Sequence, residues 1–127
     1  LIQQMLLNFI INAADAMSGH GTVVLRTGTL ERLPAHLALA PAAGERFVFV
    51  SVQDAGSGIA PEVLPRIFEP FFTTKAFSTR RGTGLGLSMV YEIAKELGFG
   101  LRVESFEGKG STFTIIIPAA GEPKDGG

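Results

Sequence analysis

The segment Arg81-Gly82-Thr83-Gly84-Leu85-Gly86-Leu87-Ser88 runs directly into an apolar-periodic stretch, and the interpretation of the whole chain starts from it. Three glycines alternate with other residues, and the pattern then becomes helical. A helix that begins here exposes a row of backbone N–H groups at the end where its dipole is positive. Such a helix start suits phosphate, so the segment predicts a phosphate-binding loop.

Two familiar phosphate motifs do not fit this spacing. A P-loop has Lys directly after its last glycine, whereas Leu87 follows Gly86 here. The dinucleotide fingerprint has its third glycine one residue later than this chain does. Because Gly-x-Gly-x-Gly is weak as an isolated motif, its interpretation depends on the segments that accompany it.

Composition sets the broad class of the protein. The 127 residues favour one domain, and 46% apolar residues allow a buried core. A net charge of −1 provides no basic field for nucleic acid or for an acidic membrane. The absence of cysteine excludes disulfides and thiol catalysis. No apolar run approaches the roughly 20 residues that span a bilayer, so we expect no direct membrane contact from this segment.

Periodicity predicts two helices, four strands and a short helical segment interrupted by Pro65. We expect an α+β fold, a two-layer α/β sandwich in which helices cover one face of a mixed sheet. The pattern opens inside a helix, so we expect a domain truncated at its N-terminus, covering 1–118, and a disordered tail or linker over 119–127. The elements are helix 1–17, strands Thr22 to Thr29 and Arg46 to Gln53, short turns from Pro61 to Phe68, helix Leu85 to Leu97, and a hairpin of Gly100 to Phe106 and Ser111 to Ile117, stopped by Pro118.

The first helix carries a polar row opposite its apolar stripe. Gln4, Asn8, Asn12 and Asp15 lie on one side because their spacing is four, four and three residues. A solvated face is the ordinary interpretation of such a row. However, solvated faces usually carry Lys and Glu, and residues 1–17 contain neither. An amide oxygen is a hard, neutral ligand suited to Mg²⁺ beside phosphate oxygens.

Two further segments are ambiguous when taken singly. Asp54-Ala55-Gly56-Ser57-Gly58-Ile59 ends an apolar strand, and it is either an ordinary turn or a carboxylate that faces a pocket, where an adenine amino group would supply the donor that a buried carboxylate needs. Phe68-Glu69-Pro70-Phe71-Phe72-Thr73-Thr74-Lys75 is either a small satellite core or the aromatic anchor of a mobile lid. Lys75, Arg80 and Arg81 would bring cations from that lid toward phosphate.

Taken together and in this order, the four segments resemble the catalytic ATP-binding domain of two-component sensor histidine kinases. This domain belongs to a superfamily that also includes gyrase, heat-shock chaperone ATPases and mismatch-repair ATPases. Residues 6–16 look like the N box, 54–59 the first glycine box, 68–75 the F box and 82–88 the second glycine box. Gly108 to Phe113 is similar to the final hairpin of the family.

The resemblance implies an enzyme, a protein-histidine kinase that takes ATP and Mg²⁺. Asn12 would hold the metal, and Asn8 and Lys75 would lie beside the phosphates. Asp54 would accept from the adenine amino group, in a pocket lined by Gly58 and Ile59. The remaining positions implied for nucleotide binding are Gly56, Gly82, Thr83, Gly84, Leu85, Gly86, Leu87, Ser88 and Ser111, the last of these acting through water.

Position 8 distinguishes branches of the superfamily. Hydrolytic members have Glu there to activate water, whereas the amide of Asn8 cannot act as a general base. The resemblance therefore implies transfer of the γ-phosphoryl group rather than rapid hydrolysis, since phosphoryl transfer needs mainly positioning and charge neutralisation. One alternative is a hydrolytic ATPase of the same superfamily. The other is a degenerate nucleotide-binding or scaffold domain, which stays open because this chain has Ala55 where the first glycine box of the family commonly has Asn.

The implied partners lie on other segments. The acceptor histidine belongs to a separate helical dimerisation domain of the same protein, and the receiver domain of a response regulator takes the phosphoryl group next. No nucleic acid is expected as a partner. The implied location is the cytoplasm, including the cytoplasmic part of a membrane-anchored sensor.

Overall fold

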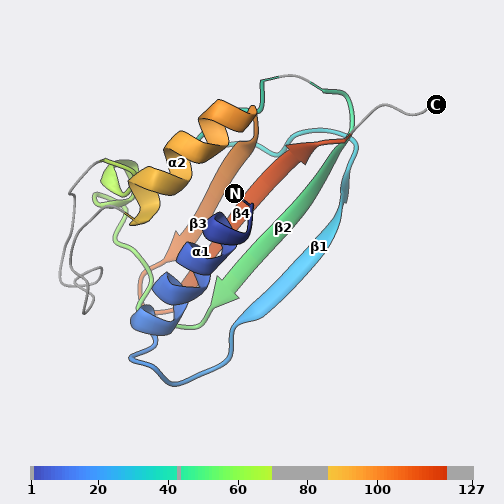
Figure 1. Cartoon of the computed structure of the whole chain (residues 1–127). Helices are drawn as coiled ribbons and strands as arrows, with labels where there is room; N and C mark the ends of the chain where they lie inside the picture. The colour runs from blue at the N-terminus through green and yellow to red at the C-terminus, as the bar shows by residue number, and fades with distance from the viewer. Residues whose placement is uncertain (1, 43, 70–85, 120–127) are drawn as a thin grey trace.

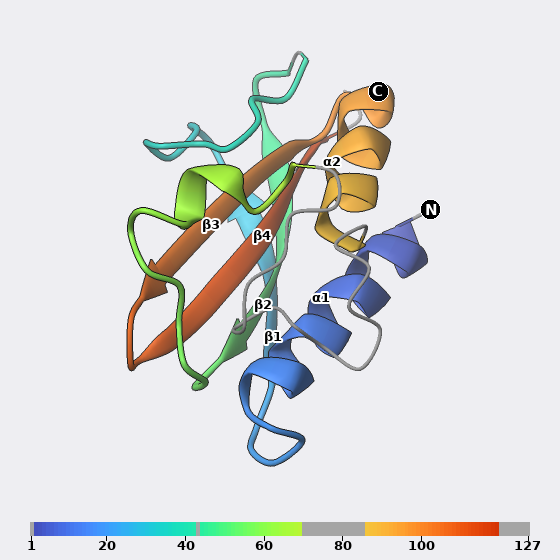
Figure 2. The same cartoon turned by 90° about the vertical axis from the view of Figure 1, so that its left-hand side faces the viewer.

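The computed structural model describes residues 2–42, 44–69 and 86–119, and these residues form two layers. Figure 1 shows both helices in front of a four-stranded sheet, and the view in Figure 2 shows them on the same side of it. The elements are α1 (Ile2–Ala16), β1 (Val24–Leu30), β2 (Phe47–Asp54), a 3₁₀ helix (Leu64–Arg66), α2 (Gly86–Leu97), β3 (Gly100–Phe106) and β4 (Gly110–Pro118).

The strand order is β1-β2-β4-β3, and each of the three neighbouring pairs is antiparallel. The two-layer sandwich with helices on one face is confirmed, but the pairing among the described strands is antiparallel throughout, where a mixed sheet was expected. β2 and β3 do run in the same direction, because each is antiparallel to β4. The connection through α2 therefore joins two strands of like direction that are not neighbours, since β4 lies between them.

Both helices end through left-handed residues. The N–H of Gly19 donates to the carbonyl of Ala14 at 2.8 Å, and the residue with positive φ is Ser18, at 56°. In α2 the N–H of Phe99 donates to Ala94 at 2.8 Å, and Gly98 has φ 77°. These bonds satisfy carbonyls that have no partner inside the helix. Both helix ends thus occur within about one residue of where the glycine signals placed them.

One of two prolines behaves differently from the sequence expectation. Pro118 does not stop β4 at Ile117, because it is the last residue of the strand and pairs with Phe47. A strand end tolerates proline, since few ladder bonds are required there. The segment from Pro61 to Phe68 holds only short helical turns, as expected, and Pro65 lies in the first turn of the 3₁₀ helix, where the missing N–H has no intrahelical partner in any case.

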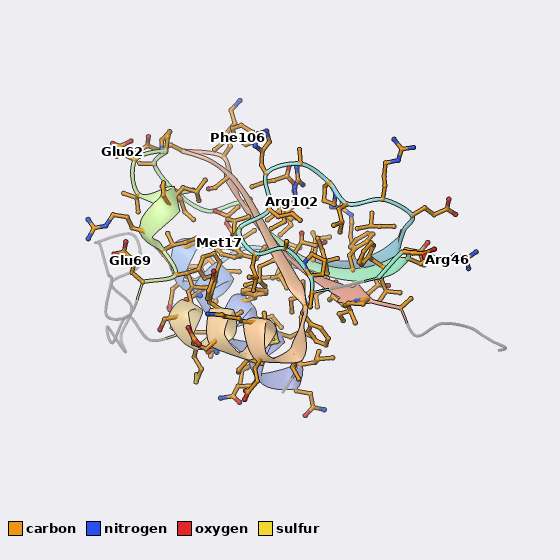
Figure 3. All side chains as sticks on the ribbon, turned by 90° about the horizontal axis from the view of Figure 1, so that it is seen from above. Met17, Arg46, Glu62, Glu69, Arg102 and Phe106 are labelled. Carbon is orange, nitrogen blue, oxygen red and sulfur yellow. The ribbon has the colours of Figure 1, made fainter. Side chains whose placement is uncertain are left out.

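The core lies between the helices and the inner face of the sheet. Met5, Phe9 and Ala13 recur every four residues on α1 and are buried. The ring of Phe9 packs against that of Phe113 on β4 with centroids 5.1 Å apart. Figure 3 shows side chains filling the space between the layers, whereas the labelled Phe106, 68% exposed, lies at the periphery. The α1 face that carries the amides is therefore oriented by packing on the adjacent face of the helix.

We expect Phe9→Ala to lower the free energy of unfolding by about 3–5 kcal/mol, because it leaves a cavity where the ring is 1% exposed. Leu7→Ala on the same helix is the control: its side chain is 55% exposed, and the change should stay within about 0.5 kcal/mol. Urea denaturation of both variants measures the difference. Equal losses would contradict the assignment of this face of α1 to the core.

Candidate functional site

The polar row of α1 is partly withdrawn from solvent. Asn8, Asn12 and Asp15 are half-buried, and the Nδ2 atoms of both asparagines and Oδ2 of Asp15 are inaccessible without a hydrogen-bond partner among the described residues. Each such buried group costs about 1–3 kcal/mol. Gln4 differs, because it is exposed and its Nε2 contacts Sδ of Met89 at 3.6 Å. Three of the four predicted members therefore belong to one buried, unsatisfied row.

The first turn of α2 lies beside this row. A Cβ built on Gly86 would be 3.8 Å from Oδ1 of Asn8, which is an ordinary contact, and Gly86 has no positive φ. The described packing therefore does not require glycine at this position. Leu87 places its side chain in the core, and Ser88 is also buried. The predicted site residues Lys75, Gly82, Thr83, Gly84 and Leu85 lie outside the described residues.

Asp54 ends β2 opposite Ser111 of β4. Its Oδ1 accepts a hydrogen bond of 2.8 Å from the N–H of Gly56, and the backbone N–H of Ser111 also donates to the carboxylate. The residue is only 6% exposed. Burial raises the pKa of this carboxyl above its ordinary value of 3.8, and the two backbone N–H groups oppose the rise without cancelling it.

The turn after Asp54 is held from two sides. The N–H of Ser57 donates to the carbonyl of Ala16, at the end of α1, at 3.3 Å. The carbonyl of Ser57 accepts a bond of 2.6 Å from Gly108 in the β3–β4 turn. The N–H of Ile59 donates to Oγ of Ser105 on β3 at 2.7 Å. The turn thus connects α1 to the β3–β4 hairpin.

Glycine at positions 56 and 58 serves these backbone contacts. A Cβ on Gly56 would lie 2.5 Å from the Ala16 carbonyl oxygen. Gly58 has φ 74°, and a Cβ there would overlap the carbonyl oxygen of Phe106. The close approach expected of these glycines is therefore made to the protein's own backbone, and Gly58 additionally lines the cavity described next.

A small enclosed cavity unites the predicted residues of α1, the turn and β4. Its volume is about 10 Å³, which is close to the space that one water molecule needs. A purine ring is larger than this cavity, so the residues that line the cavity would have to move apart to admit one. Ala16, Ser57 and Phe113, which the sequence analysis did not select, also line it; the full lining is Asn12, Ala16, Asp54, Ser57, Gly58, Ile59, Ser111 and Phe113.

Two larger hollows lie away from these residues. One of about 590 Å³ lies among the 3₁₀ helix, α2 and β3, and includes Phe68 and Tyr91 in its lining. Another, of about 410 Å³, includes Phe49, Ser51 and Thr114. None of the residues predicted to hold nucleotide or metal lines either hollow, although Phe68 of the predicted lid anchor lines the first. The larger hollows therefore do not coincide with the buried polar row of α1.

The described residues contain no group of three or more His, Cys, Asp or Glu side chains arranged for a metal ion. A metal at the polar row would therefore take few ligands from the described protein and most of them from bound oxygens or water. Mg²⁺ binds in this manner, because it retains waters and adds ligand oxygens to one or two protein groups. The buried amide of Asn12 is compatible with such a role. Within the described residues, no helix has the length and apolarity to cross a membrane.

The chain matches a family model described as "Histidine kinase-, DNA gyrase B-, and HSP90-like ATPase" over residues 1–121. It is 44% identical over 125 residues to the sensor kinase CckA of Brucella abortus, covering 96% of this chain and 13% of that protein. It is 41% identical over 124 residues to the sensor histidine kinase ZraS of Escherichia coli K12, covering 98% of this chain and 23% of that protein. The chain is thus a minor part of the length of these relatives.

Solved structures of histidine kinases are also similar to this chain. Full-length ShkA in complex with AMPPNP superposes with a TM-score of 0.70 at 31% identity, over 94% of this chain and 22% of that one. The mycobacterial sensor histidine kinase MprB gives a TM-score of 0.69 at 26% identity, over 91% of this chain and 70% of that one. The two-layer architecture is therefore shared with these kinases.

The raised pKa of Asp54 makes stability depend on pH. Because the folded state holds this proton more tightly than the unfolded state, the carboxyl favours folding at low pH. Its contribution is complete below the ordinary pKa of 3.8 and is lost as pH rises through the raised value. We expect the unfolding free energy of the wild type to fall relative to that of Asp54→Asn as pH rises from the ordinary carboxyl pKa of 3.8 through the raised pKa of Asp54.

Urea denaturation of both proteins across this range measures the effect, and all other carboxyls cancel in the difference. A constant difference would contradict the prediction, and so would a relative gain of the wild type with rising pH.

Proposed function

This chain belongs to the family of histidine kinase-, DNA gyrase B- and HSP90-like ATPases, and on that premise we propose that it binds Mg²⁺-ATP and donates the γ-phosphoryl group as the catalytic domain of a sensor histidine kinase. The relatives named as sensor kinases support the choice of branch. The AMPPNP complex of ShkA supports the choice of nucleotide.

The observation that carries the proposal is the buried, unsatisfied polar row of Asn8, Asn12 and Asp15 beside the start of α2. A protein does not stabilise itself by withdrawing amides from water without partners. Phosphate oxygens accept from amide N–H groups, and Mg²⁺ binds amide oxygens. A helix N-terminus beside the row adds positive potential for the same anion. Mg²⁺-ATP is thus a ligand whose phosphate acceptors and metal charge match this surface.

The adenine end of the ligand is assigned to Asp54. Its carboxylate is held by two backbone N–H groups and borders the cavity with Ser111 and Ile59. A carboxylate accepts a hydrogen bond from an exocyclic amino group. Adenine has an amino group at the 6-position of the purine, where guanine has a carbonyl oxygen. The water-sized volume between these residues supports a bridging water at Ser111. Lys75 and residues 82–85 complete the proposed site from outside the described ranges.

In this proposal, Asn8 favours transfer of the γ-phosphoryl group over hydrolysis of ATP. Its amide neither gains nor loses a proton near neutral pH, so it positions phosphate and does not activate water. Bound Mg²⁺ would supply charge neutralisation at the phosphates. The phosphoryl group then goes to a histidine on a dimerisation domain of the same protein and afterwards to a receiver domain. Cytoplasmic ATP and these partners assign the domain to the cytoplasmic side of its parent protein.

Calorimetric titration with ATP, with and without Mg²⁺, tests both assignments. Asp54→Asn should weaken binding by roughly 10- to 100-fold, since a hydrogen bond to a charged group is lost. Asn12→Ala should abolish the gain in affinity that Mg²⁺ provides, while binding without metal persists. Gln3→Ala, an exposed amide on the same helix, is the control and should leave both values unchanged. Retained Mg²⁺ dependence in Asn12→Ala would refute the metal assignment.

Gly86 offers a test of the phosphate assignment that is separate from folding. The described packing accepts a Cβ at this position, so Gly86→Ala should equal the wild type in stability or exceed it by up to about 1 kcal/mol. The methyl group would stand where phosphate approaches the backbone, and ATP affinity should fall about 10-fold or more. Thermal unfolding and calorimetry separate the two effects, with Glu96→Ala on the same helix as control. An unchanged ATP affinity in Gly86→Ala would contradict the assignment of phosphate binding to the start of α2.

A further inference from the structure

Ser105 is a residue that neither the motifs nor the family match selects, and its hydroxyl has three hydrogen-bond contacts. The N–H of Ile59 donates to its Oγ at 2.7 Å. The carbonyl of Gly110 lies 3.2 Å away and accepts from it. The hydroxyl of Ser111 lies at 2.7 Å, where either oxygen is a geometrically possible donor. One side chain of β3 thus contacts the turn after β2, the start of β4 and a residue of the cavity.

The number of protons decides the direction of the serine pair. A hydroxyl has one proton to donate and two lone pairs. If the Ser105 hydroxyl donates its only proton to Ser111, it has no proton left to donate to the carbonyl of Gly110. If Ser111 donates to Ser105, the latter accepts twice, from Ser111 and Ile59, and donates once, to Gly110. Only this second arrangement satisfies all three contacts.

The consequence appears at Ser111, which is 6% exposed and borders the cavity beside Asp54. With its proton used toward Ser105, the hydroxyl of Ser111 offers only lone pairs to a ligand. The carboxylate of Asp54 likewise accepts when ionised. Ser111 and Asp54 then both present acceptors to the cavity, and this pair favours a base edge or a water that donates, while Asn12, whose Nδ2 is a donor, lines the same cavity from α1.

We infer that Ser105 is a positioning residue for base recognition: it orients the hydroxyl of Ser111 so that the cavity selects a purine with a 6-amino donor over one with a 6-oxo acceptor. This inference rests on the proposed nucleotide site. Ser105 acts through Ser111 and through the N–H of Ile59, a residue that lines the same cavity. Its removal frees the proton of Ser111, which then reaches into the cavity as a donor.

The test compares the affinities for ATP and for inosine triphosphate, which differ at the 6-position of the base. In Ser105→Ala we expect ATP affinity to fall roughly 3- to 10-fold, and the ATP-to-inosine-triphosphate ratio to narrow by a similar factor. Ser105→Thr keeps the hydroxyl and should restore the ratio. Ser51→Ala is the matched control, because Ser51 is also buried but lines the separate hollow of 410 Å³, and it should leave the ratio unchanged.

The outcomes distinguish the inference from the function on which it rests. Equal losses for both nucleotides in Ser105→Ala would make the residue merely structural and overturn the inference. Failure of the wild type to bind either nucleotide would instead overturn the proposed function. If Ser105→Ala does not fold, Ser105→Cys replaces it, since a thiol of similar size is a weak donor and acceptor. An unchanged ratio in that variant would equally overturn the inference.

Discussion

The close backbone contacts of the turn after β2 are the constraint on which the site depends. Gly56 approaches the last carbonyl of α1, Gly58 approaches the carbonyl of Phe106, and Gly110 approaches that of Asp54. A side chain at any of these positions would overlap backbone atoms of the facing segment and force the two segments apart. Because α1, β2 and the β3–β4 hairpin meet here, the carboxylate of Asp54 and the amide of Asn12 border the same cavity. Fold and site thus share one set of contacts.

Hydrophobic packing and unsatisfied polar groups occupy adjacent faces of α1. Phe9 and its neighbours at four-residue spacing bury one stripe, which fixes the rotation of the helix. That rotation withdraws Asn8, Asn12 and Asp15 from water without satisfying the three atoms identified above. The core therefore holds a destabilising surface in place, and such an arrangement is typical of sites that are completed by a ligand. The cost is recovered only when donors and acceptors arrive from outside the described chain.

Most helices and strands can be predicted from the sequence because each carries a local signal. Apolar residues at helical spacing identified α1 and α2, weak alternation in a Val-, Leu- and Thr-rich stretch identified β1, and the glycine-containing turn between β3 and β4 identified their hairpin. The error at Pro118 was local too. This residue was assigned the disruptive effect of proline, whereas it occupies a position where its missing N–H does no harm. The direction of strand pairing could not be derived locally, because it depends on β4 entering between β2 and β3.

By itself, the sequence determined the two-layer architecture, the polar side chains of α1, the carboxylate at the end of β2 and the glycines around it. Periodicity and residue chemistry suffice for these, since each is a property of neighbours along the chain. Only the tertiary structure decided that Gly56 and Gly58 face protein backbone, that the shared cavity is the size of one water, and that Ser105 contacts Ser111 and Ile59. Apart from the Ser105–Ser111 contact within one hairpin, these features arise where distant segments meet, as Ile59 and Ser105 do at a sequence separation of 46. Their geometry is set by how closely two backbones approach, which no local pattern encodes.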